Sequence, residues 1–240
     1  MTTPQPSAGY DPVLFDLDGT VVDTVELIRA SFRHATRTVL GRVLPDEEIM
    51  RFVGQPLMAQ MRQLSEEHAK ELYDAYREHN HRVHDEMIRE YEGVQEMLEA
   101  LRRHGRHIGL VTSKSSKPTA MAFRSLDLKR YFDVVITADD TKKHKPDPEP
   151  LLTCLERLAL VGAPGDPAAA IYVGDSPFDV QAGKAAGMAT AAVTWGIFSR
   201  AALEAARPTY VLQRPGDVVR VCVEGDGAAL ALDRDDASPG

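Results

Sequence analysis

The chain has 240 residues, of which 43% are hydrophobic and 27% are charged, a composition typical of globular proteins. The formal net charge of −8 and the pI of about 5.5 argue against a nucleic-acid partner, because proteins that bind phosphate backbones carry a basic surface. No apolar run is long enough to span a membrane, and the start MTTPQPSAGYDP has neither a basic nor an apolar export segment. We therefore expect a cytoplasmic monomer or homodimer with no membrane partner, in which Cys154 and Cys222 are reduced.

The first predicted element is a short apolar strand in the segment DPVLFDLD, residues 11–18. A stretch from Val25 to about Arg89 follows, in which helical spacing recurs and strand signals are almost absent. A helix is then predicted over 93–105, with its apolar residues on one face and Gly105 as its stop. From about residue 106, short apolar strands alternate with helices, and the predicted strands are HIGLVTS, FDVVITADD, AAIYVGDS, MATAAVTWG and TYVLQ.

This order of elements predicts an α/β fold with a parallel, Rossmann-like sheet flanked by helices, since uninterrupted apolar strands are buried on both faces. The early helical stretch is predicted to be an inserted helical cap domain packed over the edge of the sheet. The predicted domains are an α/β core of residues 10–23 and 90–222 and a cap of residues 24–89. Residues 1–9 and 224–240 are expected to be disordered tails.

Polar residues gather where the predicted strands end. Asp16 and Asp18 follow the first strand one residue apart, so their charges repel unless a cation or a phosphoryl group offsets them. Thr112 ends the strand HIGLVT, and the segments KKHKPDPEP and GDSPFD follow later strands. Ligand sites in open parallel sheets lie beyond the carboxyl ends of the strands, so these segments are expected to meet. Taken singly, each has a structural explanation: a calcium-loop fragment for Asp-x-Asp, a helix cap for GDS and a turn for KPDP.

The segments DLDGT, LVTS, HKPDP and GDSPFD occur in this order between about residues 13 and 212, and with them the chain resembles the haloacid dehalogenase-like hydrolases. The resemblance implies that Asp16 is a nucleophile that attacks phosphorus to form an aspartyl-phosphate, and that Asp18 is the general acid and base. It also implies that Thr112 hydrogen-bonds the transferring phosphoryl group and that Lys145 balances the carboxylates and the developing charge.

The same resemblance implies a bound Mg²⁺, because oxygen ligands around a phosphoryl dianion suit this ion. Asp175 matches a metal ligand, and Asp179 matches an acidic residue that supports the metal directly or through water. Asp16 and the backbone carbonyl of Asp18 complete the expected metal site. The residues expected to bind the substrate or brace its loop are Gly19, Thr20 and Ser113 in the core and Arg51 and Gln55 in the cap.

Departures from the family pattern indicate a branch. Asp18 favours phosphate ester or anhydride chemistry, since members that cleave carbon–halogen or phosphonate bonds lack this aspartate. Ile28 and Leu57 stand where sugar-phosphate mutases of the family carry a cap His and a phosphate-binding Arg, which argues against a mutase. The segments VTWG and VGQPL resemble phosphoglycolate phosphatases, whereas DTVELIRASFRHA resembles the pyrophosphatases of the family. The sequence thus favours a phosphatase of a small phosphorylated metabolite, of phosphoglycolate type, with a pyrophosphatase as the alternative.

Two other classes stay open as alternatives. A phosphotransferase would share every catalytic residue, and a non-catalytic phosphate-binding protein could keep the fold, although degenerate members commonly lose the nucleophile. In the cap, Glu26, Arg29 and Arg33 are further candidates for substrate contact, with a solvated helix face as the alternative for each arginine. The histidines of the segment EHNHRVH lack the i, i+4 spacing of helical zinc sites, so no metal site is predicted there.

Overall fold

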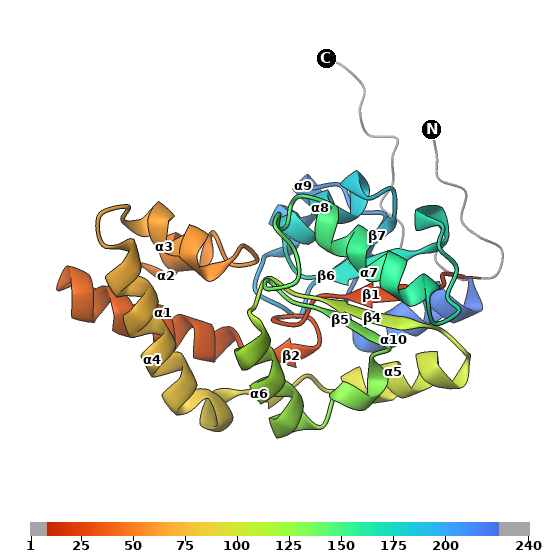
Figure 1. Ribbon diagram of the computed structural model, residues 1–240, viewed down its shortest axis with the longest axis horizontal. Coiled ribbons are helices and arrows are strands. Elements are labelled where there is room, and N and C mark those ends of the chain that lie inside the picture. Colours follow the sequence, from red (N-terminus) through yellow and green to blue (C-terminus); the bar gives the residue numbers. More distant parts are fainter. Residues whose placement is uncertain (1–8, 226–240) are drawn as a thin grey trace, which may run out of the picture.

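The computed structural model describes residues 9–225. Its centre is a six-stranded sheet made of β1 (Val13–Phe15), β4 (Ile108–Val111), β5 (Val134–Ile136), β6 (Ile171–Gly174), β7 (Ala189–Val193) and β8 (Tyr210–Leu212). All neighbouring strands are parallel, in the order β5-β4-β1-β6-β7-β8 (Figure 1). Val13 of β1 pairs with Ile108 of β4 and with Ile171 of β6, so β1 lies at the centre of the sheet.

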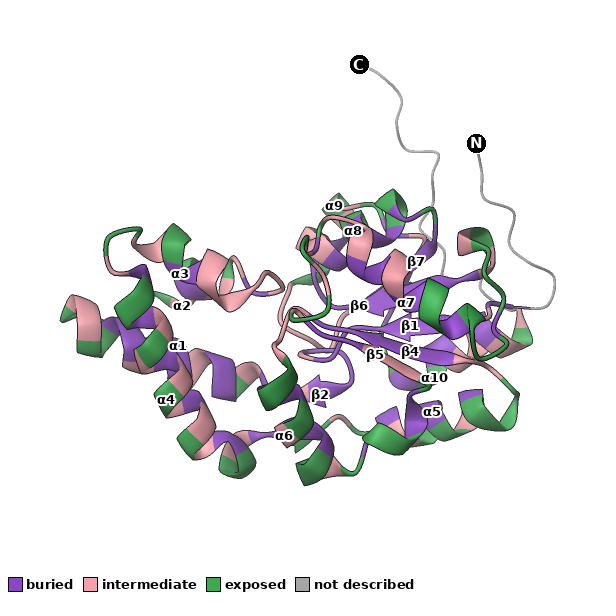
Figure 2. Cartoon of the chain, viewed as in Figure 1, coloured by how far each residue is buried: buried purple, intermediate pink, exposed green. Residues whose placement is uncertain are grey.

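Helices cover both faces of this sheet, because successive side chains of a strand point to opposite sides. Phe15 packs on the face covered by α5 (Val94–Arg103), α6 (Ser116–Leu126) and α10 (Pro215–Val219). Leu14 packs on the other face, which is covered by α7 (Glu149–Ala159) and α8 (Pro177–Ala185). Figure 2 shows the central strands buried along their length. The predicted α/β fold, a parallel sheet flanked by helices, is confirmed.

The remaining short elements are α9 (Arg200–Ala205), the 3₁₀ turns η1 (Lys129–Tyr131) and η2 (Pro167–Ala169), and the π-helical turn η3 (Arg220–Glu224). Sequence reasoning did not predict α10 and η3, which follow each other without a break shortly after β8. The segment is too short to show helical periodicity. Its start depends on Pro215 at the first helical position and on the Asp217 carboxylate, which accepts the amide of Arg214.

Four helices between β1 and β4 form a bundle with its own apolar core: α1 (Val25–Leu40), α2 (Asp46–Met50), α3 (Leu57–Leu64) and α4 (Ala69–Met87) (Figure 1, orange). The buried residues of α1 recur at spacings of three and four, so one face of this helix packs on α4. Phe32 of α1 contacts Tyr76 of α4 with their ring centroids 4.9 Å apart. Gly41 ends α1 in the left-handed conformation.

A two-stranded antiparallel ribbon, β2 (Val22–Asp23) and β3 (Arg89–Glu90), lies where the chain leaves the sheet region and returns to it. The predicted domain boundaries fall at this ribbon, and the division into core and cap domains stays a prediction. The predicted tails lie outside the described residues, apart from Gly9, Glu224 and Gly225. Within residues 9–225, no helix combines the length and the apolar character needed to cross a membrane.

Candidate active site

Asp16 stands immediately after β1, at the carboxyl end of the central strand. Its amide donates a hydrogen bond to the Val173 carbonyl of β6 at 2.9 Å, which extends the pairing of the two strands by one residue. Thr112 follows β4 and Asp175 follows β6, so the two strands beside β1 bring these side chains to Asp16. Together with Asp18, the three line one cavity of about 220 Å³.

Lys145 is buried behind Asp16, with its side chain only 1% exposed. Its Nζ lies 2.9 Å from Asp16 Oδ1 and 2.7 Å from Asp179 Oδ1, and it donates a hydrogen bond to the Tyr172 hydroxyl at 3.1 Å. Burial alone would lower the pKa of a lysine, but the two carboxylate charges outweigh it and raise the pKa of Lys145. The group therefore stays an ammonium, and each of its three hydrogens has an acceptor.

Asp179 has both carboxylate oxygens engaged by the protein. Its Oδ2 accepts the Ser176 amide at 3.0 Å and the Ser176 hydroxyl at 2.5 Å, and this capping box begins α8. Its Oδ1 faces Lys145 and, at 3.2 Å, the Tyr172 hydroxyl. A Cβ at Gly174 would overlap this carboxylate, so glycine there makes room for it. In this arrangement Asp179 positions Lys145, and its role at a metal stays a prediction.

Asp16, Asp175 and Asp179 form a group of buried carboxylates whose oxygens lie within 4.8 Å of one another. Burial raises the pKa of Asp16 to about 7, with Lys145 opposing and the charges of Asp179 and Asp18 adding to the rise. Burial, followed by repulsion from Asp179 and Asp16, also raises the pKa of Asp175 well above its usual range. One ammonium thus leaves excess negative charge in this site. A divalent cation would balance that charge, and Mg²⁺ prefers such oxygen ligands, so the donor set fits it.

The loop after β1 leaves space for the Asp175 carboxylate. Gly19 has a φ of +77°, and a Cβ there or at Gly196 would overlap this carboxylate. The Thr20 carbonyl accepts a hydrogen bond from the Trp195 indole at 3.0 Å, which ties the loop to the segment after β7. Gly19 and Thr20 therefore shape the site from behind, and neither lines the cavity.

Asp18 lies on the cavity wall and is held from two sides. Its Oδ1 accepts hydrogen bonds from the Thr24 hydroxyl at 2.7 Å and from Lys114 Nζ at 2.5 Å. Thr24 directly precedes α1, whereas Lys114 lies in the loop after β4. Sequence reasoning missed Lys114, although its place just after a strand end was a usable signal.

One loop of the helical bundle closes against the strand ends. The Ser113 hydroxyl donates a hydrogen bond to the Gly54 carbonyl at 2.6 Å. A Cβ at Gly54 would lie 2.9 Å from the Ser176 hydroxyl and 3.1 Å from the Phe178 ring, so only glycine permits this approach without displacement. Ser113 lines the cavity, and so does Gln55, which follows Gly54 in the chain.

Arg51 does not line the cavity. It is exposed, and its guanidinium stacks on the adjacent phenylalanine ring at 4.4 Å. Arg29 and Arg33 both pair with Asp46 of α2, and Glu26 pairs with Arg29. These groups satisfy one another on the outside of the bundle, so the structure does not bring them together with the strand-end residues.

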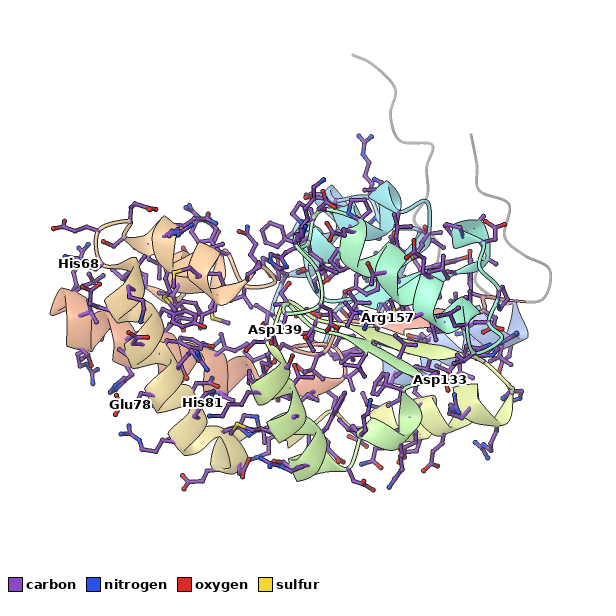
Figure 3. All side chains as sticks on the ribbon, in the orientation of Figure 1. His68, Glu78, His81, Asp133, Asp139 and Arg157 are labelled. Atoms are coloured by element: carbon purple, nitrogen blue, oxygen red, sulfur yellow. The ribbon has the colours of Figure 1, made fainter. Side chains whose placement is uncertain are left out.

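Besides Ile28 of α1 and the segment 53–60, the bundle residues that line the cavity come from one face of α4. They recur at spacings of three and four, and they are Tyr73, Tyr76, Arg77, Asn80 and His81. In Figure 3, His81 lies on the side of α4 toward α6, whereas Glu78 lies on the opposite side and Asp139 lies near the strand ends. The helical spacing of this segment was visible in the sequence, but the pattern alone could not distinguish a polar face that lines a cavity from one that faces solvent.

The comparison with known proteins agrees with this geometry. A family model described as haloacid dehalogenase-like hydrolase matches residues 13–193, a range that includes all four motifs. The chain belongs to the haloacid dehalogenase-like hydrolases, as the motifs had implied.

Individual relatives are similar over nearly their whole length. The pyrophosphatase PpaX of Bacillus velezensis is 40% identical over 209 residues, which are 87% of this chain and 94% of that protein. PpaX of Bacillus cereus is 39% identical with the same coverage. Among solved structures, a protein of Lactobacillus plantarum provisionally named phosphoglycolate phosphatase is 26% identical, with a TM-score of 0.78 over 89% of this chain and 99% of that one.

Proposed function

We propose that the protein is a Mg²⁺-dependent phosphohydrolase that releases phosphate from a small phosphorylated compound, with Asp16 as its nucleophile. The observation that carries this proposal is the placement of Asp16. Its side chain opens onto the cavity, while Lys145 holds one carboxylate oxygen from behind. A carboxylate oriented in this way is ready to attack a phosphorus atom in the cavity.

The neighbouring residues have separate tasks in this proposal. Lys145 orients Asp16 and offsets part of the negative charge that a phosphoryl dianion brings. Thr112 Oγ1 accepts the Lys114 amide at 3.1 Å, which leaves the hydroxyl hydrogen to donate to a phosphoryl oxygen. Asp16 and Asp175 would hold Mg²⁺, and the ion, when bound, supplies charge neutralisation for the transferring group.

Asp18 is the proposed general acid and base. It lies two residues beyond Asp16 on the same cavity wall, so it can protonate the leaving oxygen as the aspartyl-phosphate forms. It then accepts a proton from the water that attacks this phosphorus, and hydrolysis returns Asp16 to its carboxylate form. The contact between Ser113 and Gly54 holds one loop of the helical bundle against the strand ends, which narrows the access of bulk water to the cavity.

For the substrate we propose pyrophosphate first and 2-phosphoglycolate second. Pyrophosphate is favoured by the relative that carries the name pyrophosphatase, which is 40% identical over 94% of its length. Phosphoglycolate is favoured by the provisional name of the Lactobacillus plantarum structure, at 26% identity, and by the segments VTWG and VGQPL. The order is the reverse of the one that the motifs alone favour.

The test is phosphate release, with Mg²⁺, from pyrophosphate, 2-phosphoglycolate and p-nitrophenyl phosphate. We expect the protein to release phosphate, and we expect Asp16→Asn to abolish this turnover. An added acceptor alcohol should not become phosphorylated, as it would with a phosphotransferase. Undiminished turnover in Asp16→Asn would refute the covalent mechanism. Phosphate binding without turnover of any substrate would instead favour the non-catalytic alternative.

A further inference from the structure

Three basic side chains line the cavity but have no task in the mechanism above. Arg77 and His81 lie on the same face of α4, and Lys114 lies in the loop after β4. The first two therefore come from the helical bundle and the third from the sheet region. Their mutual proximity is reflected in His81, whose pKa is lowered by burial and then by the positive charges around it, those of Arg77 and Lys114 included.

The Arg77 guanidinium forms no ion pair with a carboxylate among the described residues. Its charge does act on Asp139, whose pKa is lowered first by hydrogen bonds from Ser116 and to a smaller extent by Arg77. Its guanidinium donates to the Tyr73 hydroxyl at 3.2 Å and lies 5.3 Å from the centre of that ring. Asp139 also lines the cavity, but its carboxylate accepts the Ser116 amide at 2.8 Å. Most of the hydrogen-bonding capacity of the guanidinium is thus available to an anion inside the cavity.

The surroundings strengthen this positive charge. Apolar side chains form much of the cavity lining: Ile28, Val53, Leu57, Met58 and Phe198. Charges enclosed by such a lining are screened less than charges in water, so an anion bound between them is held more strongly. The Gly54–Ser113 contact holds the loop that carries Val53 against the strand ends.

Lys114 connects this region to the chemistry, because its Nζ is 2.5 Å from the carboxylate of Asp18. A cation therefore lies beside the residue proposed to protonate the leaving oxygen, close to the first atoms of the leaving group. In pyrophosphate the charged oxygens of the leaving group are two bonds from the bridging oxygen. In 2-phosphoglycolate the carboxylate oxygens are three bonds away and carry a single charge. The position of Lys114 suits the more highly charged and nearer group.

We propose that Arg77 and Lys114, with His81 beside them, form a subsite for the leaving phosphoryl group of a diphosphate substrate. The inference rests on the proposed function and deepens it, because it assigns the selection of the substrate to the charge of its leaving group. Asp16 and Asp175 act on the transferring phosphoryl group, and the α4 face together with Lys114 binds the other one.

The decisive variant is Arg77→Gln, since Arg77 contacts neither Asp16 nor Asp18. We expect kcat/KM for pyrophosphate to fall by about tenfold or more beyond any fall for p-nitrophenyl phosphate, whose aryl leaving group needs no cation. Arg82→Gln is the matched control, because Arg82 is an exposed arginine of the same helix that does not line the cavity. Equal losses for the two substrates, or a larger loss for 2-phosphoglycolate than for pyrophosphate, would overturn the subsite.

A binding measurement separates the failure of this inference from the failure of the proposed function. Methylenediphosphonate is a non-hydrolysable diphosphate, and calorimetry on the wild type and on Arg77→Gln measures its affinity without any turnover. We expect its affinity to be weakened about tenfold or more in Arg77→Gln and unchanged in Arg82→Gln. Equal affinity in all three proteins would reject the subsite even if phosphate release is observed. The expected weakening would support it even if no tested substrate is hydrolysed.

Discussion

The site has two parts whose side chains are held differently. We call Asp16 with Lys145 and Asp179 behind it the floor, and the cavity-facing side of α4 with Arg77 and His81 the wall. On the floor, Lys145 and Asp179 are fully buried and each makes several polar contacts within the protein. On the wall, the Arg77 side chain makes one hydrogen bond to its own helix, and no hydrogen bond links the His81 imidazole to another described residue. The floor is preorganised for one reaction, whereas the wall has hydrogen-bond donors that are available to a bound substrate. Substitutions on the floor should therefore affect every substrate, and substitutions on the wall should discriminate between substrates.

The largest effect should come from Asp16→Asn, which removes the nucleophile from the floor with little change in volume. We expect turnover of every substrate to fall by at least about 10³-fold. The melting temperature should hold or rise, because burial and like charges disfavour the ionised carboxylate in the metal-free protein. A variant that lost turnover of one substrate only would break the distinction between floor and wall.

Lys145→Met should come next, since it leaves the buried carboxylates of Asp16 and Asp179 without their ammonium partner. We expect kcat to fall by roughly 10²- to 10³-fold. Unfolding in denaturant should show a destabilisation of about 3–5 kcal/mol. Stability equal to that of the wild type would show that the amine does not hold the floor together.

A smaller loss is expected for Tyr172→Phe. The Tyr172 hydroxyl lies 3.1 Å from Lys145 Nζ and 2.9 Å from the Val111 carbonyl, so it links the amine to the end of β4. Its removal should lower kcat by about tenfold and stability by about 1 kcal/mol, with little change in KM and in the ranking of substrates. Tyr210→Phe is the matched control, because that buried hydroxyl contacts Tyr10 at 3.1 Å away from the site. A Tyr172→Phe variant with altered substrate ranking would move this residue from a positioning to a specificity role.

Mg²⁺ should stabilise the protein more at pH 7.5 than at pH 5. The pKa of Asp16 is about 7 when folded and 3.8 as the ordinary value, so the folded state binds more protons between these values. Stability of the metal-free protein therefore falls as the pH rises from about 4 to 7, and the cation should restore it. We expect Mg²⁺ to raise the melting temperature by roughly 5 °C at the higher pH, and by less at pH 5. Asp175→Asn should reduce this rise, and an equal rise at both pH values would contradict the charge argument.

Arg51→Ala should have the smallest effect. The sequence made Arg51 a candidate for substrate binding, but its side chain is exposed and stacks on Phe52 outside the cavity. We expect kcat/KM for every substrate to stay within about twofold and stability within about 0.5 kcal/mol of the wild type. A changed substrate ranking in this variant, but not in Arg77→Gln, would show that α4 does not select the substrate.

Local sequence determined the core of the site because Asp16, Thr112 and Asp175 each directly follow a strand. The runs before Asp16, Thr112 and Asp175 are continuously apolar, so they form central parallel strands whose carboxyl ends meet at one edge. The motifs and their order were sufficient to predict the fold and the family.

The tertiary structure alone decided which of the other polar residues take part. Arg51 and Arg77 are both arginines of helical or near-helical segments, and no local pattern distinguishes them. Arg77 lines the cavity because α4 packs on α1, α3 and α6, whereas Arg51, at the end of α2, lies exposed outside the cavity. The same holds for the Tyr172 hydroxyl, which reaches Lys145 from a position 27 residues away in sequence. Strand periodicity is a local property of the chain, whereas the direction of a polar side chain toward a cavity depends on contacts between distant segments.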